Sequence, residues 1–320
     1  MMEKKEKNSL NKHPIMITVL VILMIYSLSL LIVLAWGLLT SLKHADDLML
    51  MGNWIGLPDM EWSEAEATKL NNYLLVLTRS ELNFTTKFYV GSNLVTHTVE
   101  DCNYLTYVIN TVLYTVTGSL ILAGVPAIGA YMCSKYKFAF SKIQITVYLL
   151  FMMIPIIGAY PSELKVLRGL GMYDTFWGNW IQKLHFSGMY FFVYLAFYQG
   201  MSDAYTEAAE IDGASQFNIL CRIVIPLSIK TIGSVWLIQF ITLWNDYQTP
   251  LLYLPTKPTL AYVTYLFTDG VAAAGLDNLL RGSIPIEITA CMLLALPILV
   301  LYIAFNQKMM GDISMGGIKG

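Results

Sequence analysis

Six runs of apolar residues dominate the sequence and constrain its fold more than any other feature. A helix needs about 20 consecutive apolar residues to cross the hydrocarbon core of a bilayer. The runs lie near 15–39, 104–133, 143–160, 186–201, 231–253 and 284–305. The fourth is short and the fifth contains Asp246. Because a spanning segment must bond its own backbone groups, we expect an all-α integral membrane protein with six transmembrane helices.

Composition agrees with a membrane class, since 56% of the residues are hydrophobic and 13% are charged. Globular domains carry about a quarter charged residues. The net charge of −2 and the lack of a basic patch interleaved with aromatic residues exclude a nucleic-acid binder. The cysteines lack the spacing of a disulfide framework or a zinc site, and the histidines are isolated, so we expect no metal. The cysteines are Cys102, Cys133, Cys221 and Cys291.

Lysine and arginine in short loops favour the cytoplasmic side of a membrane. Basic residues gather before the first run and after the second, whereas 43–103 is rich in acids. This predicts that both termini are cytoplasmic. The expected organisation is a cytoplasmic segment at 1–14, a first transmembrane helix at 15–42, an extracytoplasmic lobe at 43–103, a core transmembrane domain at 104–306 with a cytoplasmic segment at 202–226, and a cytoplasmic tail at 307–320. A signal peptide competes for the first run, but the run is long and has no small-residue cleavage site, which favours an uncleaved helix.

The segment Thr206–Pro226 reads TEAAEIDGASQFNILCRIVIP. Thr206 or Asp203 is a candidate cap for a short helix, and Gly213 has the backbone freedom to end it. A second helix is expected at 215–222, with one apolar face, before Pro226 interrupts the chain; the face is Phe217, Ile219, Leu220 and Cys221. Two short helices around a sharp turn suit docking to another protein, and an ordinary amphipathic loop is the alternative.

The spacing within this segment resembles the EAA signature of ABC importer permeases. In that signature EAA, three residues, a glycine, nine residues and I-x-L-P recur together. The matching residues are Glu207, Ala208, Ala209, Asp212, Gly213, Ala214, Ile223 and Pro226. Ile225 stands where the family has leucine, which preserves apolar volume. The resemblance implies that 202–226 couples the protein to an ATPase, and we call 202–226 the coupling segment.

Further stretches narrow the resemblance to permeases of the carbohydrate-import type, as in the G-type permease of maltose importers. Asn72 with Tyr73, Asn110, Pro155, the stretch 170–175 and Pro297 match family patterns. The WNDY cluster also matches, as does a terminal pentapeptide that is especially specific. The WNDY cluster is Trp244, Asn245, Asp246, Tyr247 and Pro250. The terminal pentapeptide is Gly316, Gly317, Ile318, Lys319 and Gly320. The stretch 75–102 is longer than this family leads us to expect.

What the resemblance implies is a non-catalytic subunit of an importer in a prokaryotic plasma membrane. No GxxxxGK[ST] phosphate loop occurs in the sequence, so ATP and Mg²⁺ are expected on a separate ATPase dimer. The other implied partners are a second, homologous permease, an extracytoplasmic sugar-binding protein and membrane lipid. The implied cargo is a carbohydrate, with an oligosaccharide as the expectation.

The WNDY cluster keeps two interpretations. Ionisable groups within a bilayer often mark a pathway, and sugars need hydrogen-bonding and aromatic groups. The same residues suit a structural helix break, with Asn245 bonding backbone groups that Pro250 frees. We favour the break. The loop 255–285 is a candidate either to enter the binding-protein cleft or to be a plain connector.

Other function classes differ in their requirements. An importer for a non-sugar solute would share the EAA segment. A membrane-embedded enzyme would need paired catalytic groups at membrane depth, and none is visible in the predicted spans. A structural scaffold would neither retain an ATPase nor support ATP-dependent uptake.

The terminal pentapeptide gives a first prediction. If the tail contacts the ATPase, deleting 316–320 lowers ATP-driven uptake in membrane vesicles at equal membrane abundance of the protein. The competing interpretation is a frayed tail. Uptake equal to that of the full chain would disprove the contact.

Overall fold

The computed structural model describes residues 14–44, 47–48, 52–58, 71–79, 82–90, 93–136, 139–154, 158–186, 188–268 and 283–310. They divide between two compact units, each described by itself. One comprises 1–79 with 277–293, and the other comprises 80–276 with 294–320. Helix α15, Ile284–Met310, contributes residues to both.

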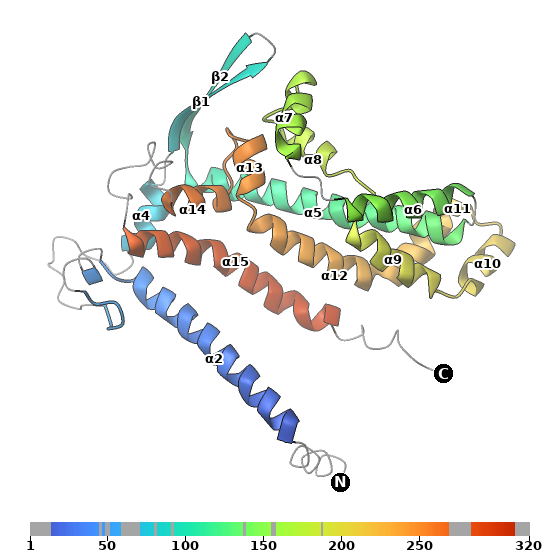
Figure 1. The fold of residues 1–320 in the computed structure, drawn as a ribbon, viewed down its shortest axis with the longest axis horizontal. Coiled ribbons are helices and arrows are strands. Elements are labelled where there is room, and N and C mark those ends of the chain that lie inside the picture. The colour runs from blue at the N-terminus through green and yellow to red at the C-terminus, as the bar shows by residue number, and fades with distance from the viewer. Residues whose placement is uncertain are drawn as a thin grey trace. The chain divides into compact units, whose positions relative to one another are not determined.

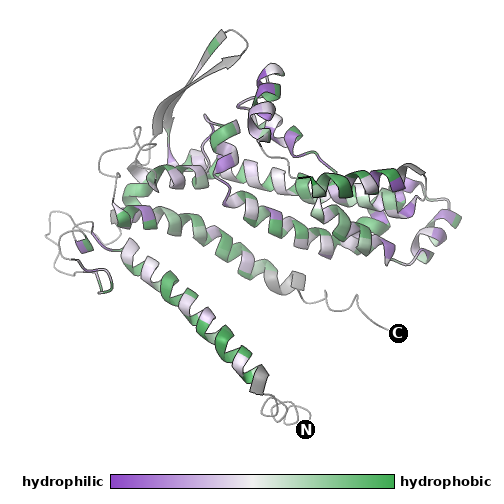
Figure 2. Cartoon of the chain, viewed as in Figure 1, coloured by the Kyte–Doolittle hydropathy of each residue, from purple (hydrophilic) through white to green (hydrophobic). Residues whose placement is uncertain are grey.

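The first unit contains α2, Pro14–Ser41, and α4, Asn71–Arg79. No side of α2 is clearly more apolar than another. Residues along it are largely exposed, and Figure 2 shows that they are largely apolar. Its C-terminal end is bonded by Asn72, whose Nδ2 donates to the carbonyl oxygens of Ser41 at 2.9 Å and Lys43 at 2.8 Å. Thr289, on the first part of α15, donates to the Ser41 carbonyl at 3.1 Å. These bonds satisfy carbonyls that a helix end leaves without partners.

The second unit is built around α5, Tyr104–Lys135, which lies beside α9, Met189–Gln199, and α12, Ile225–Trp244 (Figure 1). Asn103 caps α5 by accepting a hydrogen bond from the Thr106 N–H at 3.1 Å. Small residues on α5 allow the close approach: Ala123, Ala127 and Ala130 are 0–2% exposed. Aromatic residues of α9, with Phe191 and Tyr194 fully buried, fill the space against them.

Shorter elements complete this unit. They are α6, Ala139–Met153; α7, Ala159–Gly169; α8, Phe176–Gln182; α10, Ala204–Ile211; α11, Gln216–Ile219; a π-helical turn η2, Leu220–Val224; α13, Gln248–Tyr253; and α14, Leu260–Thr268. Asp174 joins α8 to the chain after α13, because its carboxylate accepts from the Thr256 N–H at 3.2 Å and the Thr256 hydroxyl at 2.5 Å. The Asp174 backbone is left-handed, at φ 61°.

Residues 82–102 correct the all-α expectation. Strands β1, Leu82–Val90, and β2, Asn93–Cys102, pair antiparallel, with Val90 opposite Asn93 and Leu82 opposite Cys102. A bulge falls between Leu82 and Phe84. Threonine and valine are frequent in the two strands, and β1 also contains Phe84, Phe88 and Tyr89; such residues favour an extended backbone. The lobe predicted at 43–103 therefore contains a hairpin.

The six predicted spans correspond to four long helices and two short ones among the described residues. The long apolar helices are Met16–Ser41, Tyr104–Lys135, Gln216–Trp244 and Ile284–Phe305. The third predicted span overlaps α6, which has 15 residues, and the fourth contains α9, which has 11. At 1.5 Å per residue α9 extends about 17 Å, which is less than the roughly 30 Å of a bilayer core. The chain is a multi-pass membrane protein whose count of crossings stays a prediction.

Helix α8 generates a stability prediction. A Cβ at Gly178 would lie 2.1 Å from the carbonyl oxygen of Met172, a backbone atom that cannot simply rotate away. Gly178→Ala should therefore lower the free energy of unfolding by about 1–3 kcal/mol. Its thermal midpoint in detergent, measured by intrinsic fluorescence, should fall.

The control is Gly169→Ala, in the last turn of α7, where an added Cβ meets nothing within 4 Å. The thermal midpoint of this variant should equal that of the unchanged protein or lie slightly above it, because alanine reduces the conformational freedom of the unfolded chain. Equal midpoints for the two variants would contradict the packing at Gly178.

Candidate functional site

The coupling segment begins with α10, which ends in a left-handed turn. Gly213 has φ 76°, a conformation that side chains disfavour. Its N–H donates to the Glu210 carbonyl at 3.0 Å, and the Ala214 N–H donates to the Ala209 carbonyl at 2.9 Å. The pair of bonds closes the C-terminal end of α10. The predicted turn at Gly213 is thereby confirmed.

Capping at the start of α10 differs from the prediction. Asp203 precedes the helix but makes no side-chain cap bond, and the Thr206 hydroxyl donates back to the Asp203 carbonyl at 2.9 Å. The Asp203 carboxylate is instead engaged by Lys135, whose ammonium nitrogen lies 2.6 Å from Oδ1. An ion pair with α5 therefore takes the carboxylate that would have capped α10.

Pro226 does not interrupt the second helix, contrary to the expectation. Helix α11, turn η2 and α12 form one run, Gln216–Trp244. In η2 the Ile225 N–H bonds to the Leu220 carbonyl, five residues back. Pro226 lies within the first two positions of α12, where its missing N–H costs least. The cytoplasmic helix predicted at 215–222 is therefore continuous with a long apolar helix.

The two short helices bury one side and expose the other. Thr206, Ala209, Ile219 and Val224 are 0–8% exposed, and the last three join the core formed with α5 and α9. The outer side exposes Tyr205, Glu207, Ala208, Ile211, Asp212 and Phe217. Ile211 is 86% exposed and Phe217 is 72% exposed.

The predicted apolar face of the second helix is therefore wrong in part. Ile219 is fully buried, whereas Phe217 and Cys221 are exposed. At 100° per residue, positions 217 and 219 lie nearly opposite each other, while 217 and 221 share a side. Of the other matched residues, Ala214 and Ile223 are half-buried against the same core, and Pro226 is exposed.

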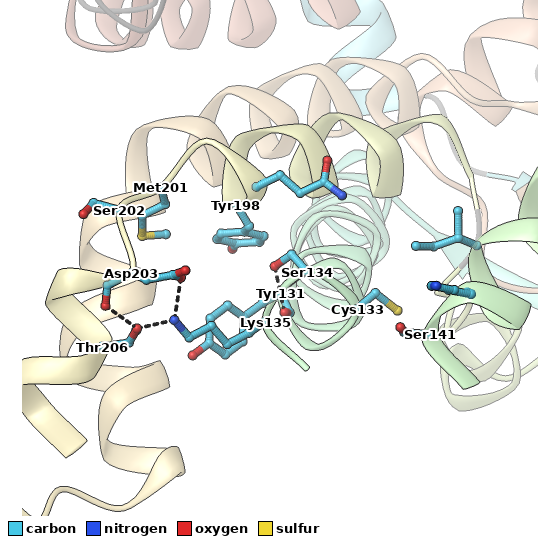
Figure 3. A pocket seen from close by; sticks show the side chains of 13 residues that line it. Tyr131, Cys133, Ser134, Lys135, Ser141, Tyr198, Met201, Ser202, Asp203 and Thr206 are labelled. Atoms are coloured by element: carbon cyan, nitrogen blue, oxygen red, sulfur yellow. Dashed lines mark hydrogen bonds and ion pairs between the residues drawn. The ribbon is translucent and has the colours of Figure 1, made fainter. Parts of the chain in front are cut away.

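The C-terminal end of α5 contacts both short helices, and Figure 3 shows its contact with α10. Lys135 bonds the carboxylate of Asp203 and also the hydroxyl of Thr206. The neighbouring Tyr136 hydroxyl donates to Gln216 Oε1 at 2.6 Å, and Gln216 Nε2 donates to Glu210 at 3.0 Å. These side chains, which we call the brace, join α5, α10 and α11 into one body.

A cavity of about 520 Å³ lies beside this brace. Its walls come from the end of α5, the start of α6, the end of α9 and the start of α10, as Figure 3 shows. Polar lining residues include Ser134, Lys135, Ser141, Lys142 and Thr206. The sequence patterns did not indicate this cavity, because its lining residues come from segments far apart in the chain.

The WNDY cluster lies at the end of α12. Trp244 is buried and its Nε1 donates to the Leu294 carbonyl at 2.9 Å. Asn245 Nδ2 donates to the Ile241 carbonyl at 2.9 Å, and Asp246 Oδ1 accepts from the Thr249 N–H at 3.0 Å. The predicted fifth span, 231–253, is thus interrupted after Trp244. Tyr247 stacks on Tyr265 with ring centroids 4.4 Å apart, and Pro250 is buried in α13.

Lys183 is a polar residue of this region that the sequence analysis did not single out. It is 8% exposed, and its Nζ lies 2.7 Å from Asn179 Oδ1 and 4.6 Å from the centre of the Tyr114 ring. Tyr114 in turn donates to Asp246 Oδ2 at 2.6 Å. Lys183 also lies against Gly118, in the middle of α5. The signal for it was weak, because a single lysine beside a short apolar run is common.

Two groups of predicted residues fall wholly or partly outside the described chain. The tail residues Gly316, Gly317, Lys319 and Gly320 lie beyond position 310, and most of the loop 255–285 lies in 269–282. Within the described part of the chain, no group of three potential metal ligands occurs. The roles assigned to the coupling segment and to the WNDY cluster stay predictions.

The brace gives a prediction about local opening. Asp203→Asn removes the charge that attracts Lys135, so α10 should separate from α5 more often. Amide hydrogen exchange in 204–211 should rise severalfold, while exchange in the centre of α12 stays unchanged. Global stability should fall by less than about 1 kcal/mol, because Asp203 is 68% exposed.

The matched control is Asp212→Asn, which makes the same substitution at the other, exposed end of α10. It leaves the contact with Lys135 in place. Equal exchange in 204–211 for the two variants would show that the ion pair does not hold α10.

No family model matches the chain, but comparisons with individual proteins find similar permeases. The chain is 24% identical over 190 residues to the arabinooligosaccharide transport permease AraQ of Bacillus subtilis, covering 59% of this chain and 65% of AraQ. It is 25% identical over 214 residues to the melibiose, raffinose and stachyose import permease MelC of the same organism, covering 66% and 75%. The matched region spans 57% to 65% of the length of the first curated relatives.

The fold is similar to that of a solved structure. A chain in the crystal structure of a bacterial ABC transporter involved in the import of the acidic polysaccharide alginate matches with a TM-score of 0.67 and 19% identity. The match covers 92% of this chain and 95% of that one. The homologues of this multi-pass membrane protein are thus carbohydrate ABC importer permeases, and its fold is that of an ABC importer chain.

Proposed function

We propose that the chain is the permease subunit of an ATP-driven importer for a carbohydrate and forms half of the translocation pathway. The observation that carries this proposal is the geometry of the coupling segment. Two short helices meet at Gly213 and present exposed residues outward, while their inner sides pack on the membrane helices. The similarity to sugar permeases supports the same assignment.

The proposed assembly contains partners that hold the chemistry. A dimer of ATPases binds ATP and Mg²⁺, a second permease completes the pathway, and an extracytoplasmic binding protein delivers solute. Six crossings with both termini in the cytoplasm would place the coupling segment on the ATPase side. This chain would have no catalytic role, in line with its permease relatives.

The outer side of the coupling segment suits a protein groove. Ile211 and Phe217 are large apolar side chains with most of their surface exposed, and an exposed apolar patch rimmed by polar residues is typical of a docking surface. Glu207 and Asp212 provide the rim. The small Ala208 allows the partner to approach the backbone closely.

Motion of the coupling segment can reach the membrane through a continuous helix. Because α11, η2 and α12 form one run, a displacement of α11 is transmitted along α12 to Trp244. Closure of the ATPase dimer would then bias the membrane helices from an inward-facing to an outward-facing state. ATP binding acts by favouring one of two packings of the same helices.

The cargo is proposed from the relatives. AraQ is an arabinooligosaccharide permease and MelC is a permease for melibiose, raffinose and stachyose. An oligosaccharide is therefore the proposed substrate class.

Gly213 tests the coupling role. Gly213→Val forces a β-branched residue into a left-handed backbone conformation, which costs about 1–2 kcal/mol and should reopen the turn. An added Cβ meets nothing within 4 Å, so the effect is on the backbone alone. The ATPase retained on affinity purification from native membranes should fall severalfold, and ATP-dependent sugar uptake should fall with it.

Gly213→Asn is the matched control, because asparagine tolerates the left-handed conformation and fills the same open space. It should keep most of the ATPase. If both variants lose the ATPase, the loss results from adding a side chain at position 213 and not from opening the turn. Failure to recover any ATPase with the unchanged protein, even from gently solubilised membranes, would contradict the importer function and favour an embedded enzyme or a scaffold.

A further inference from the structure

The cavity beside the coupling segment has the polarity of an anion site. Two lysines, Lys135 and Lys142, line it together with four serine and threonine residues. Lysine ammonium groups and hydroxyls are strong donors to phosphate oxygens. The hydroxyls belong to Ser134, Ser141, Ser202 and Thr206.

Only part of this donor capacity is used within the protein. Lys135 is paired with Asp203, but the ammonium of Lys142 makes no ion pair with the described residues and is exposed. Tyr131, which also lines the cavity, is 5% exposed and its buried hydroxyl has no hydrogen-bond partner among the described residues. With Asp203 counted, the lining retains one net positive charge.

The surroundings of the cavity decide which phosphate compound fits. Helix α6 contributes Ser141, Lys142 and Ile145 to the wall, and continues with an exposed apolar stripe. Leu149 is 48% exposed, Met152 51% and Met153 78%, at positions that share the side of the helix on which Lys142 and Ile145 line the cavity. A molecule with a phosphate headgroup and acyl chains would match the cavity and the stripe at once.

We propose that this cavity binds the headgroup of an anionic phospholipid, with Lys142 and Lys135 donating to the phosphate and the acyl chains lying along α6. Basic pockets between membrane helices on the cytoplasmic side are suited to such headgroups. The headgroup would share Lys135 with Asp203 and Thr206. Lipid bound here would therefore contact the residue that holds α10 to α5.

The test measures lipid binding on the intact importer complex and needs no transport. Native mass spectrometry of the complex in detergent, titrated with phosphatidylglycerol, gives the affinity. Lys142→Gln should weaken binding roughly tenfold, because one charge-assisted hydrogen bond to phosphate is lost. Lys142→Arg should restore most of it. Unchanged assembly of each variant on size exclusion excludes misfolding.

Two controls separate the cavity from the general membrane surface. Lys165→Gln removes the same charge from an exposed lysine on α7 and should leave the affinity unchanged. Phosphatidylcholine, which carries a compensating positive charge, should bind several times more weakly. Equal affinities for the unchanged protein and Lys142→Gln, or for the two lipids, would overturn the proposal.

Inorganic phosphate distinguishes the two sources of the same chemistry. If the acyl chains contribute, millimolar phosphate should displace little phosphatidylglycerol. Efficient displacement by phosphate would overturn the lipid assignment and leave a site for free phosphate. A complex that binds phosphatidylglycerol as expected but fails in sugar uptake would leave this inference standing while contradicting the proposed function.

Discussion

The close packing of α5 against α9 and α12 is the interaction on which the rest of the structure depends. The alanines of α5 leave room for fully buried aromatic rings of α9, including Phe191 and Tyr194. Ile219 and Val224, at the start of the long run that leads into α12, belong to the same core. The coupling segment thus forms one end of the core that α5, α9 and α12 share, and α10 packs against this core through Ala209.

A buried polar network lies at the other end of α12. Tyr114 lies in α5, Lys183 directly follows α8 and Asp246 follows α12, and buried charged groups are costly unless they have partners. The Asp246 carboxylate offsets the free-energy cost of burial with two hydrogen bonds, which it accepts from the Tyr114 hydroxyl and the Thr249 N–H. The bonds of Asn245 and Asp246 are those expected of a helix break.

Periodicity and motif spacing in the sequence were sufficient for the long helices and the turn at Gly213, because both depend on local residue types. The hairpin at 82–102 was not predicted, although Gly91 and Ser92 separate two runs rich in β-branched residues, the first of them also aromatic, which is a recognised hairpin signal. Pro226 was predicted to interrupt the chain because proline lacks an N–H, but it lies within the first two positions of α12, directly after a π-helical turn, where that N–H is not needed. The cavity and the contact between Lys135 and Asp203 join residues 68 positions apart, which no local pattern reports.

The brace at the end of α5 explains how a weak contact can matter for coupling. An exposed ion pair contributes little to global stability, so Lys135 and Asp203 do not hold the fold together. We predict instead that they influence whether α10 moves with α5 or apart from it. Helix α11 continues into α12, and α10 is joined to α11 by the turn at Gly213 and by the bond from Gln216 to Glu210. If an ATPase acts on α10 as proposed, the force reaches the membrane helices by two routes. One passes through Gly213 into α12 and the other through Lys135 into α5. Under the proposed function both routes are needed for α5 and α12 to move together, and a ligand on Lys135 would act on the second route.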